Sequence, residues 1–374
     1  MLNKYSKSLS ILIFTILSGC DLVNSDVETI EKSRNHLSRP EKSNDGWNIG
    51  TLEGAGVNRQ LMVDLVHDVN NGKFSGISSI LLVKDGQLIV EEYFGEAKMN
   101  KLHTMRSASK AVTSALVGIA IEQGYIESEE AKVLPYFPEY EGLIKNWDER
   151  KRRIKLKHIL SMTSGIKGNE DAMYPTNDWI KFYFDQPVSS TPGKEFSYAT
   201  SGVVVLGSVI TRTSGLRIPE FTNKYLFEPL GIHEYRWPIT NSLGNQGLAM
   251  TGGGLKLKSR DMAKFGQLYL NNGIWEGQRI ISRDWVEKST TKQATSDYQD
   301  EDFGYLWRMI DRNIKGTSVH SFEAWGNGGQ FIMVFPELKL VAVFTGENYG
   351  KFPEMEQPFK MIDRYILPAI IQEN

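Results

Sequence analysis

The fold is organised around the stretch Met105-Arg106-Ser107-Ala108-Ser109-Lys110, which runs directly into the apolar residues 111–120. This pattern predicts a buried helix that begins near Ser107 and ends near Gly124, because glycine is favoured just past a helix C-terminus. Ser107 and Lys110 lie three residues apart, so their side chains share one face of the helix. A serine nucleophile needs a group that accepts its proton, and a desolvated lysine can do so. The segment is thus a candidate catalytic helix.

The Ser-x-x-Lys spacing is weak evidence when it is taken alone. It occurs three times in the chain, also at residues 164–167 and 289–292. Only the copy at Ser107 opens a long apolar segment, whereas the other two lie in turn-rich or polar sequence. An ordinary buried helix that starts with serines is the competing interpretation, and other segments must decide between the two.

Strand patterns occur towards both ends of the chain. Residues 77–83 and 87–94 are apolar strands separated by Asp85-Gly86, a strong signal for a two-residue hairpin. Residues 304–309, 330–335 and 340–345 form a second group of predicted strands. Residues 125–250 instead carry turn residues and short amphipathic patterns, which favour helices. The expected fold class is therefore α/β (α+β), with an antiparallel sheet from both termini flanked by helices and an inserted mostly helical domain at about 125–250.

Five further helices are expected around this sheet. Apolar periodicity bounded by turn signals predicts them over residues 59–69, 154–165, 202–210, 259–270 and 353–371. Ser259 is the expected N-cap of the fourth helix. Gly252-Gly253-Gly254, just ahead of that helix, predicts a tight turn.

Residues 1–20 resemble a bacterial lipoprotein signal peptide. Two early lysines precede a short apolar run, and the segment ends in Leu17-Ser18-Gly19-Cys20, which is similar to a lipobox. In such signals the cysteine is lipidated, and Cys20 is the only cysteine of the chain. Residues 21–44 are polar and predict a flexible tether, which leaves 45–374 as the folded domain. We therefore expect the membrane as a partner through the lipid on Cys20 and a location in the bacterial cell envelope. Asp21 favours the periplasmic face of the inner membrane over the cell surface.

Charge and histidine distribution argue against other functional classes. The 43 Lys and Arg residues balance 45 Asp and Glu residues, so the chain lacks the electrostatic footprint that a nucleic-acid partner requires. The six histidines are scattered, without the paired spacings that bind zinc. Neither a metal nor an organic cofactor is expected.

Two later segments carry further candidate groups. Tyr198 lies between a Pro-Gly turn and a predicted helix, so its phenol can project into a cleft. An unperturbed phenol is a poor base, and it needs a cationic neighbour such as Lys110. The stretch Trp325-Gly326-Asn327-Gly328-Gly329-Gln330 leads into a strand, where glycines let backbone approach a ligand and N–H groups can point at an oxyanion. A packed tyrosine and a simple glycine turn are the competing interpretations when each segment is taken alone.

Taken in order, these three segments resemble the Ser-x-x-Lys serine hydrolases of the β-lactamase and penicillin-binding-protein superfamily. The similar branch contains class C β-lactamases, D,D-peptidases, family VIII-type esterases and 6-aminohexanoate-oligomer hydrolases. The similarity runs from about Trp47 to Ala369 and includes residues 160–165, 226–232 and 261–266. The resemblance implies that Ser107 is the nucleophile, Lys110 its proton acceptor or relay, and Tyr198 a general base. It also implies an oxyanion hole formed by the backbone N–H groups of Ser107 and Gln330.

Two departures from the family pattern concern substrate binding. The Tyr-x-Asn motif of the family reads Tyr198-Ala199-Thr200 in this chain, so the shorter hydroxyl of threonine replaces a carboxamide. The Lys-Thr-Gly motif of the family aligns with Asn327-Gly328-Gly329, which removes the lysine cation. Both changes weaken the case for a β-lactamase and leave the acyl-transfer residues intact. The expected function is an envelope-anchored serine hydrolase that cleaves a small-molecule ester or amide through an acyl-enzyme on Ser107. The alternatives are a β-lactamase or D,D-peptidase and, from another class, a non-catalytic binding lipoprotein. The sequence leaves open the natural substrate and whether Tyr198 or Lys110 is the principal base.

Overall fold

The computed structural model of the protein describes residues 37–239, 247–298 and 300–371. The predicted signal peptide, Cys20, Asp21 and most of the predicted tether lie outside these residues. A compact unit begins at Leu37, which is buried, so the folded domain starts ahead of the boundary expected at residue 45. No helix within the described ranges is long and apolar enough to cross a membrane.

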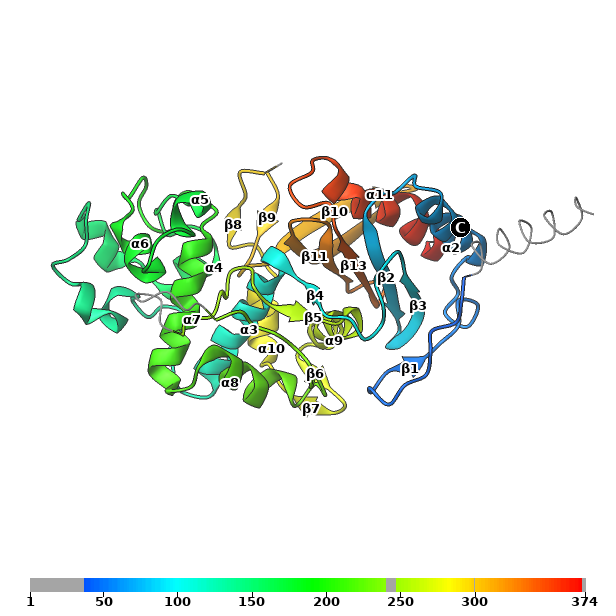
Figure 1. Cartoon of the computed structure of the whole chain (residues 1–374), viewed down its shortest axis with the longest axis horizontal. Helices are drawn as coiled ribbons and strands as arrows, with labels where there is room; N and C mark the ends of the chain where they lie inside the picture. The colour runs from blue at the N-terminus through cyan, green and yellow to red at the C-terminus, as the bar shows by residue number, and fades with distance from the viewer. Residues whose placement is uncertain (1–36, 240–246, 299, 372–374) are drawn as a thin grey trace, which may run out of the picture. The chain divides into compact units, whose positions relative to one another are not determined.

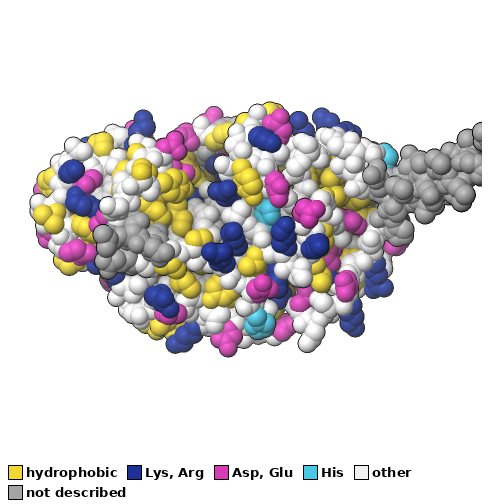
Figure 2. All heavy atoms as spheres, viewed as in Figure 1, with side chains coloured by type: hydrophobic (Ala, Val, Ile, Leu, Met, Phe, Trp, Pro, Cys, Tyr) yellow, Lys and Arg dark blue, Asp and Glu magenta, His cyan; other side chains and the backbone are white. Residues whose placement is uncertain are grey.

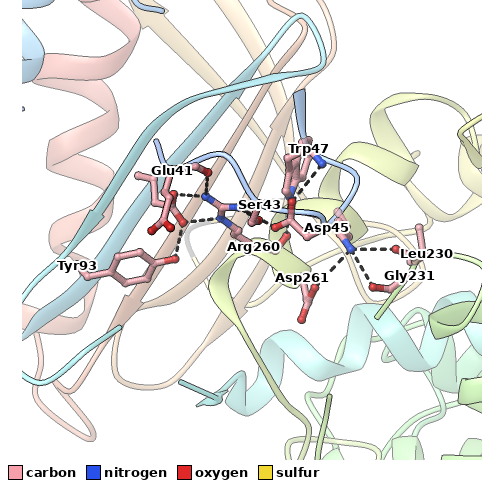
Figure 3. Close-up of polar contacts among 11 residues, drawn as sticks. Glu41, Ser43, Asp45, Trp47, Tyr93, Leu230, Gly231, Arg260 and Asp261 are labelled. Carbon is pink, nitrogen blue, oxygen red and sulfur yellow. Dashed lines mark hydrogen bonds and ion pairs between the residues drawn. The ribbon is translucent and has the colours of Figure 1, made fainter. Parts of the chain in front are cut away.

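The N-terminal end of the described chain packs on the domain because it completes the hydrogen bonding of a buried arginine. Arg260 is 3% exposed and pairs with the buried carboxylate of Glu91. Its remaining N–H groups donate to the Glu41 carbonyl at 2.6 Å, to Ser43 Oγ at 2.6 Å and to the Asp45 carboxylate at 2.8 Å (Figure 3). Unpaired donors in the interior are costly, so this part of the predicted tether folds against the domain.

One nine-stranded sheet forms the centre of the domain, in the order β1-β3-β2-β13-β12-β11-β10-β9-β8. The hairpin of β2 and β3 turns at Asp85 and Gly86, whose φ values of 50° and 76° suit a type I′ turn. β13 pairs antiparallel with β2, so the two ends of the chain build one sheet, as the sequence predicts. The strands are β1 (Asn48–Ile49), β2 (Ile77–Lys84), β3 (Gln87–Tyr93), β8 (Ala294–Thr295), β9 (Asp302–Phe303), β10 (Arg308–Ile314), β11 (Thr317–Gly326), β12 (Gln330–Phe335) and β13 (Leu340–Gly346).

Helices cover both faces of this sheet (Figure 1). On one face, α2 (Arg59–Asn70) and the C-terminal helices α11 (Gln357–Met361) and α12 (Leu367–Ile370) enclose one hydrophobic core. On the other face, α9 (Ser259–Leu270) and α3 (Ser109–Glu122) belong to a larger core that they share with the helical region. The predicted catalytic helix is α3, and it therefore lies between the sheet and the helical region. Acidic and basic side chains are interspersed over the face shown in Figure 2, so charges on that face act locally.

The described part of residues 125–250 is built from helices and turns. The helix predicted over 154–165 is shorter, because Met162 takes a positive φ of 55° that a right-handed helix cannot continue. The valine-rich helix is confirmed as α7, which ends at Gly215 in the left-handed conformation. The α-helices of this region are α4 (Leu156–Leu160), α5 (Glu170–Met173), α6 (Trp179–Asp185), α7 (Thr200–Ser214) and α8 (Ile218–Thr222).

Two local predictions in the C-terminal half are wrong. The strand expected at 304–309 begins only at Arg308, because Leu306 has a positive φ of 64° that interrupts the extended chain. Ser259 is not the N-cap of α9, since Lys258 holds that position and the Ser259 hydroxyl bonds to Ser79 Oγ at 2.9 Å. In addition, β11 is a strand that the sequence pattern did not predict, and it ends at the third motif.

Candidate active site

Ser107 lies in the middle of a single 3₁₀ turn, Arg106–Ala108, that leads into α3. The residue before it, Arg106, has a φ of 47°, a left-handed conformation that costs a non-glycine residue about 1–2 kcal/mol. The turn is held in this shape from both sides. Ser109 Oγ donates to the Arg106 carbonyl at 2.6 Å, and the Met105 N–H donates to the Leu255 carbonyl at 2.9 Å. The Ser107 side chain is therefore presented from a fixed and strained turn, half-buried at the start of the helix.

Lys110 places its ammonium directly beside this hydroxyl. The side chain is buried in the first turn of α3, and Nζ donates to Ser107 Oγ at 3.1 Å. Nζ also lies 4.8 Å from the centre of the Tyr198 ring. The three residues predicted to be catalytic are thus brought together, with the lysine in contact with both the serine and the tyrosine. A cation over an aromatic face is stabilised by the ring quadrupole, which helps to hold Lys110 in a site with little water.

Gly252 supplies a second acceptor for Lys110, and the sequence analysis missed its role. The Gly252 carbonyl accepts a hydrogen bond from Nζ, while a Cβ on this residue would lie 2.6 Å from Thr200 Cγ2. The carbonyl of the neighbouring Thr251 accepts a hydrogen bond from Thr113 Oγ1 at 2.8 Å. The Thr251 hydroxyl donates to the Val203 carbonyl, also at 2.8 Å. The turn is therefore wedged between α3 and α7. The run of three glycines was a visible signal, but it indicated only a turn.

Tyr198 lies directly before Ala199, the N-cap of α7. Thr200, 2% exposed, donates its hydroxyl proton to the carboxylate of Glu170, the first residue of α5. A Cβ on Gly168 would lie 1.9 Å from the Tyr198 carbonyl oxygen, so the segment that carries Glu170 runs against the Tyr198 backbone. No sequence pattern singled out Glu170, because its partner is 30 positions away.

The third motif forms the connection from β11 to β12 and abuts the nucleophile turn. A Cβ on Gly326 would lie 2.2 Å from the Met105 carbonyl oxygen. Gln330 is buried, and its side chain bonds to both backbone groups of Gly346, at 2.6 and 3.2 Å. The Asn327 side chain is exposed, and its Oδ1 accepts from the Gly350 N–H at 2.7 Å. These contacts bring the motif to the nucleophile, while the oxyanion role of the Ser107 and Gln330 N–H groups stays a prediction.

Two tyrosines stand at the rim of the site. Tyr174 is 50% and Tyr349 is 37% exposed. The guanidinium of Arg106 lies 4.5 Å from the Tyr349 ring centre, and that ring packs where a Cβ on Gly328 would be, at 2.5 Å. Gly328 and Gly329 have φ values of 95° and 94°, which only glycine adopts readily. Within the described part of the chain, no group of His, Cys, Asp and Glu side chains is arranged to hold a metal ion.

A buried lysine against a serine on a strained turn, joined by a tyrosine and a glycine-rich strand connection, defines a serine hydrolase of the Ser-x-x-Lys class. The family model described as "Beta-lactamase" matches residues 60–356, and the chain belongs to this family. The fold class and family expected from the sequence are therefore confirmed.

Several known proteins are similar to this chain. A 6-aminohexanoate-dimer hydrolase of Paenarthrobacter ureafaciens is 23% identical over 66% of this chain and 68% of its own. A β-lactamase of Escherichia coli is 28% identical over 70% of this chain and 80% of its own. Among solved structures, a family VIII carboxylesterase has a TM-score of 0.62 at 17% identity and covers 81% of this chain and 96% of its own. A penicillin-binding protein homologue from Pyrococcus abyssi has a TM-score of 0.64 at 20% identity and covers 82% of this chain and 78% of its own.

Proposed function

We propose that the protein cleaves an ester or an amide through an acyl-enzyme on Ser107. The observation that carries the proposal is the contact of 3.1 Å between Ser107 Oγ and the buried Lys110 Nζ, with the Tyr198 ring centre 4.8 Å from the same nitrogen. In the first step, Ser107 Oγ bonds to the substrate carbonyl carbon, and its proton passes to the Lys110–Tyr198 pair. That proton then goes to the leaving alcohol or amine as its bond to carbon breaks.

Hydrolysis of the acyl-enzyme repeats these steps with water. The Lys110–Tyr198 pair takes a proton from the water, the hydroxide adds to the acyl carbon, and Ser107 Oγ leaves with the proton returned to it. The negative charge on the carbonyl oxygen is stabilised by the N–H groups of Ser107 and Gln330. Such donors are worth about 3–4 kcal/mol each in comparable sites.

We propose that uncharged or weakly charged esters and amides are better substrates than β-lactams. Asn327 takes the place of a lysine, so the motif itself offers no cation to a substrate carboxylate, a contact worth about 1.5–3 kcal/mol. The relatives described as a 6-aminohexanoate-dimer hydrolase and a family VIII carboxylesterase support this choice. The relative described as a β-lactamase supports the second candidate, a β-lactamase or D,D-peptidase.

Mass spectrometry of the intact protein tests the proposal after exposure to a mixed set of p-nitrophenyl esters, amides and β-lactams. We expect an acyl adduct from an ester or amide, mapped to Ser107 and absent in Ser107→Ala. An adduct on Ser109 would refute the nucleophile assignment. Nitrocefin turnover as efficient as ester turnover would favour the β-lactamase. No adduct from any substrate, and none from a serine-directed phosphonate, would favour the non-catalytic binding lipoprotein.

We also propose that a lipid on Cys20 anchors the hydrolase in the bacterial envelope, with Asp21 favouring the periplasmic face of the inner membrane. This proposal rests on the lipobox-like sequence alone, because residues 1–36 lie outside the described structure. One acyl chain gives only marginal membrane binding, so stable anchoring requires at least a second chain on the same cysteine.

A further inference from the structure

A carboxylate lies beside the predicted base of the active site. Glu170 accepts the hydroxyl proton of Thr200, which lies two residues after Tyr198. The segment that carries Glu170 lies against the Tyr198 backbone, because a Cβ on Gly168 would be only 1.9 Å from the Tyr198 carbonyl oxygen. Because Thr200 is 2% exposed and fixed at the start of α7, the position of the Glu170 carboxylate is set by a buried partner. Glu170 itself remains partly exposed and so is accessible to a ligand.

The charge of Glu170 is not neutralised by a neighbouring cation. Among the described residues, no lysine, arginine or histidine forms an ion pair with it. Burial raises the pKa of the Tyr174 phenol, and the negative charge of Glu170 raises that pKa further. The positive charge of Arg106 lowers it, so both charges act on this tyrosine. The Arg106 guanidinium, however, is stacked on Tyr349, on the side of the third motif. Glu170 is thus a carboxylate held against the Tyr198–Thr200 segment, and Arg106 is a guanidinium held on the third motif.

The hydrogen-bonding character of this corner is also one-sided. The Thr200 hydroxyl has a single proton, and it is donated to Glu170. Only acceptors remain for a ligand, namely the oxygen sites of the partly exposed Glu170 carboxylate that Thr200 does not occupy. A protonated amine presents donors and a positive charge together, and it matches such a corner better than a neutral or anionic group does.

We propose that Glu170, held in place by Thr200, selects substrates that carry a protonated amine near the scissile bond. The proposal rests on the hydrolase function proposed above and names the substrate class of that site. The ammonium group belongs either to the acyl part or to the leaving group, and both give the same contact with the carboxylate. A charge-assisted hydrogen bond at this position favours the ammonium substrate by about 10- to 100-fold over an isosteric neutral one.

Two pairs of substrates that are close in shape separate the two placements of the charge. p-Nitrophenyl 3-aminopropanoate and p-nitrophenyl butanoate differ by an ammonium in place of a methyl group in the acyl part. 4-(Aminomethyl)phenyl acetate and 4-ethylphenyl acetate differ by an ammonium in place of a methyl group in the leaving group. The measured quantity is the ratio of kcat/KM for the charged over the neutral member of each pair, in the wild type, Glu170→Gln and Asp171→Asn.

We expect one ratio to exceed unity in the wild type and to fall about tenfold or more in Glu170→Gln, in which Thr200 still has an oxygen to donate to. Asp171→Asn is the matched control, because it removes the same charge from the next residue, which is exposed. Its ratios are expected to stay within about twofold of the wild type, since exposed charges are largely screened. If Glu170→Gln fails to fold, the wild-type ratio measured at low and high ionic strength replaces it, and it is expected to fall with added salt.

Wild-type ratios at or below unity, an unchanged ratio in Glu170→Gln, or an equal fall in Asp171→Asn would overturn the proposal. So would a salt-independent wild-type ratio. Failure of the hydrolase function itself looks different, because Ser107→Ala would then not abolish turnover of the neutral esters.

Discussion

Replacing Gly252 by alanine tests whether the turn between α3 and α7 sets the position of the catalytic lysine. A Cβ at residue 252 would lie 2.6 Å from Thr200 Cγ2 and 3.1 Å from the Thr200 carbonyl oxygen. Thr200 is buried at the start of α7 in a close-packed interior, so the turn rather than the threonine has to shift. The carbonyl that shifts is the one that accepts from Lys110 Nζ.

The expected effect on activity is larger than the effect on stability. Overpacking of this kind costs about 1–3 kcal/mol, which lowers Tm by about 1–4 °C for a domain of this size. Misplacing a catalytic group by about 1 Å lowers the rate about 100-fold. We therefore expect Gly252→Ala to lose about two orders of magnitude in kcat/KM for p-nitrophenyl butanoate while its thermal unfolding curve shifts by only a few degrees.

Gly253→Ala is the matched control for this experiment. A Cβ at residue 253 would lie 3.8 Å from the Arg106 carbonyl carbon, an ordinary contact distance, and neither glycine has a left-handed φ. We expect kcat/KM and Tm of this variant to stay close to the wild type. Wild-type kcat/KM in Gly252→Ala, or an equal loss in the two variants, would refute the idea that the Gly252 carbonyl positions the lysine.

Three further variants test other parts of the molecule. Tyr198→Phe keeps the ring 4.8 Å from the lysine but removes the phenol, so kcat should fall about 100- to 10,000-fold at unchanged Tm; near-normal kcat would remove the phenol from the proton transfers. Burial raises the pKa of Asp261 from 3.8 to about 6, although Lys264 opposes this, so its ionisation destabilises the fold progressively as the pH rises through that interval. Asp261→Asn should therefore stabilise the domain by up to about 2–3 kcal/mol near pH 8 and by little below about pH 4, measured by urea unfolding; a gain that does not depend on pH contradicts this origin. Cys20→Ala should move the protein from the membrane to the soluble fraction, and unchanged membrane association would exclude the lipid anchor.

The parts of the fold that were predicted correctly depend on short-range signals. Asp85-Gly86 fixes the first hairpin because both residues adopt a positive φ without help from the rest of the chain. The apolar run after Lys110 is likewise a local signal, and it predicts α3 correctly. In this helix 12 consecutive residues, from Ser109 to Ala120, are buried. β11 escaped prediction because its exposed and buried residues do not alternate regularly at its start. Its pairing partners on both sides, rather than its own pattern, define it as a strand.

The residues of the candidate active site were also identified only where a local sequence signal exists. Ser107, Lys110 and Tyr198 were identified from residue types and motif spacing, and the structure brings them together. The Gly252 carbonyl was not identified, because it meets Lys110 from 142 positions away and a backbone carbonyl leaves no mark in a sequence. The pairing of Arg260 with Glu41, Ser43 and Asp45 was missed for an analogous reason. Charged residues near an N-terminus look like a solvated tether unless their buried partner is known.

Two charged residues near the site, Arg106 and Glu170, change how the missing lysine has to be interpreted. Asn327 removes the cation of the third motif, but Arg106 brings a guanidinium onto Tyr349, whose ring packs against Gly328 of the same motif. Glu170 places a carboxylate on Thr200, in a segment that runs against the Tyr198 backbone. A substrate carboxylate is attracted by Arg106 and repelled by Glu170, and a substrate ammonium meets the reverse. Under the proposed function, preference among substrates therefore depends on both of these charges, rather than on the loss of one lysine alone.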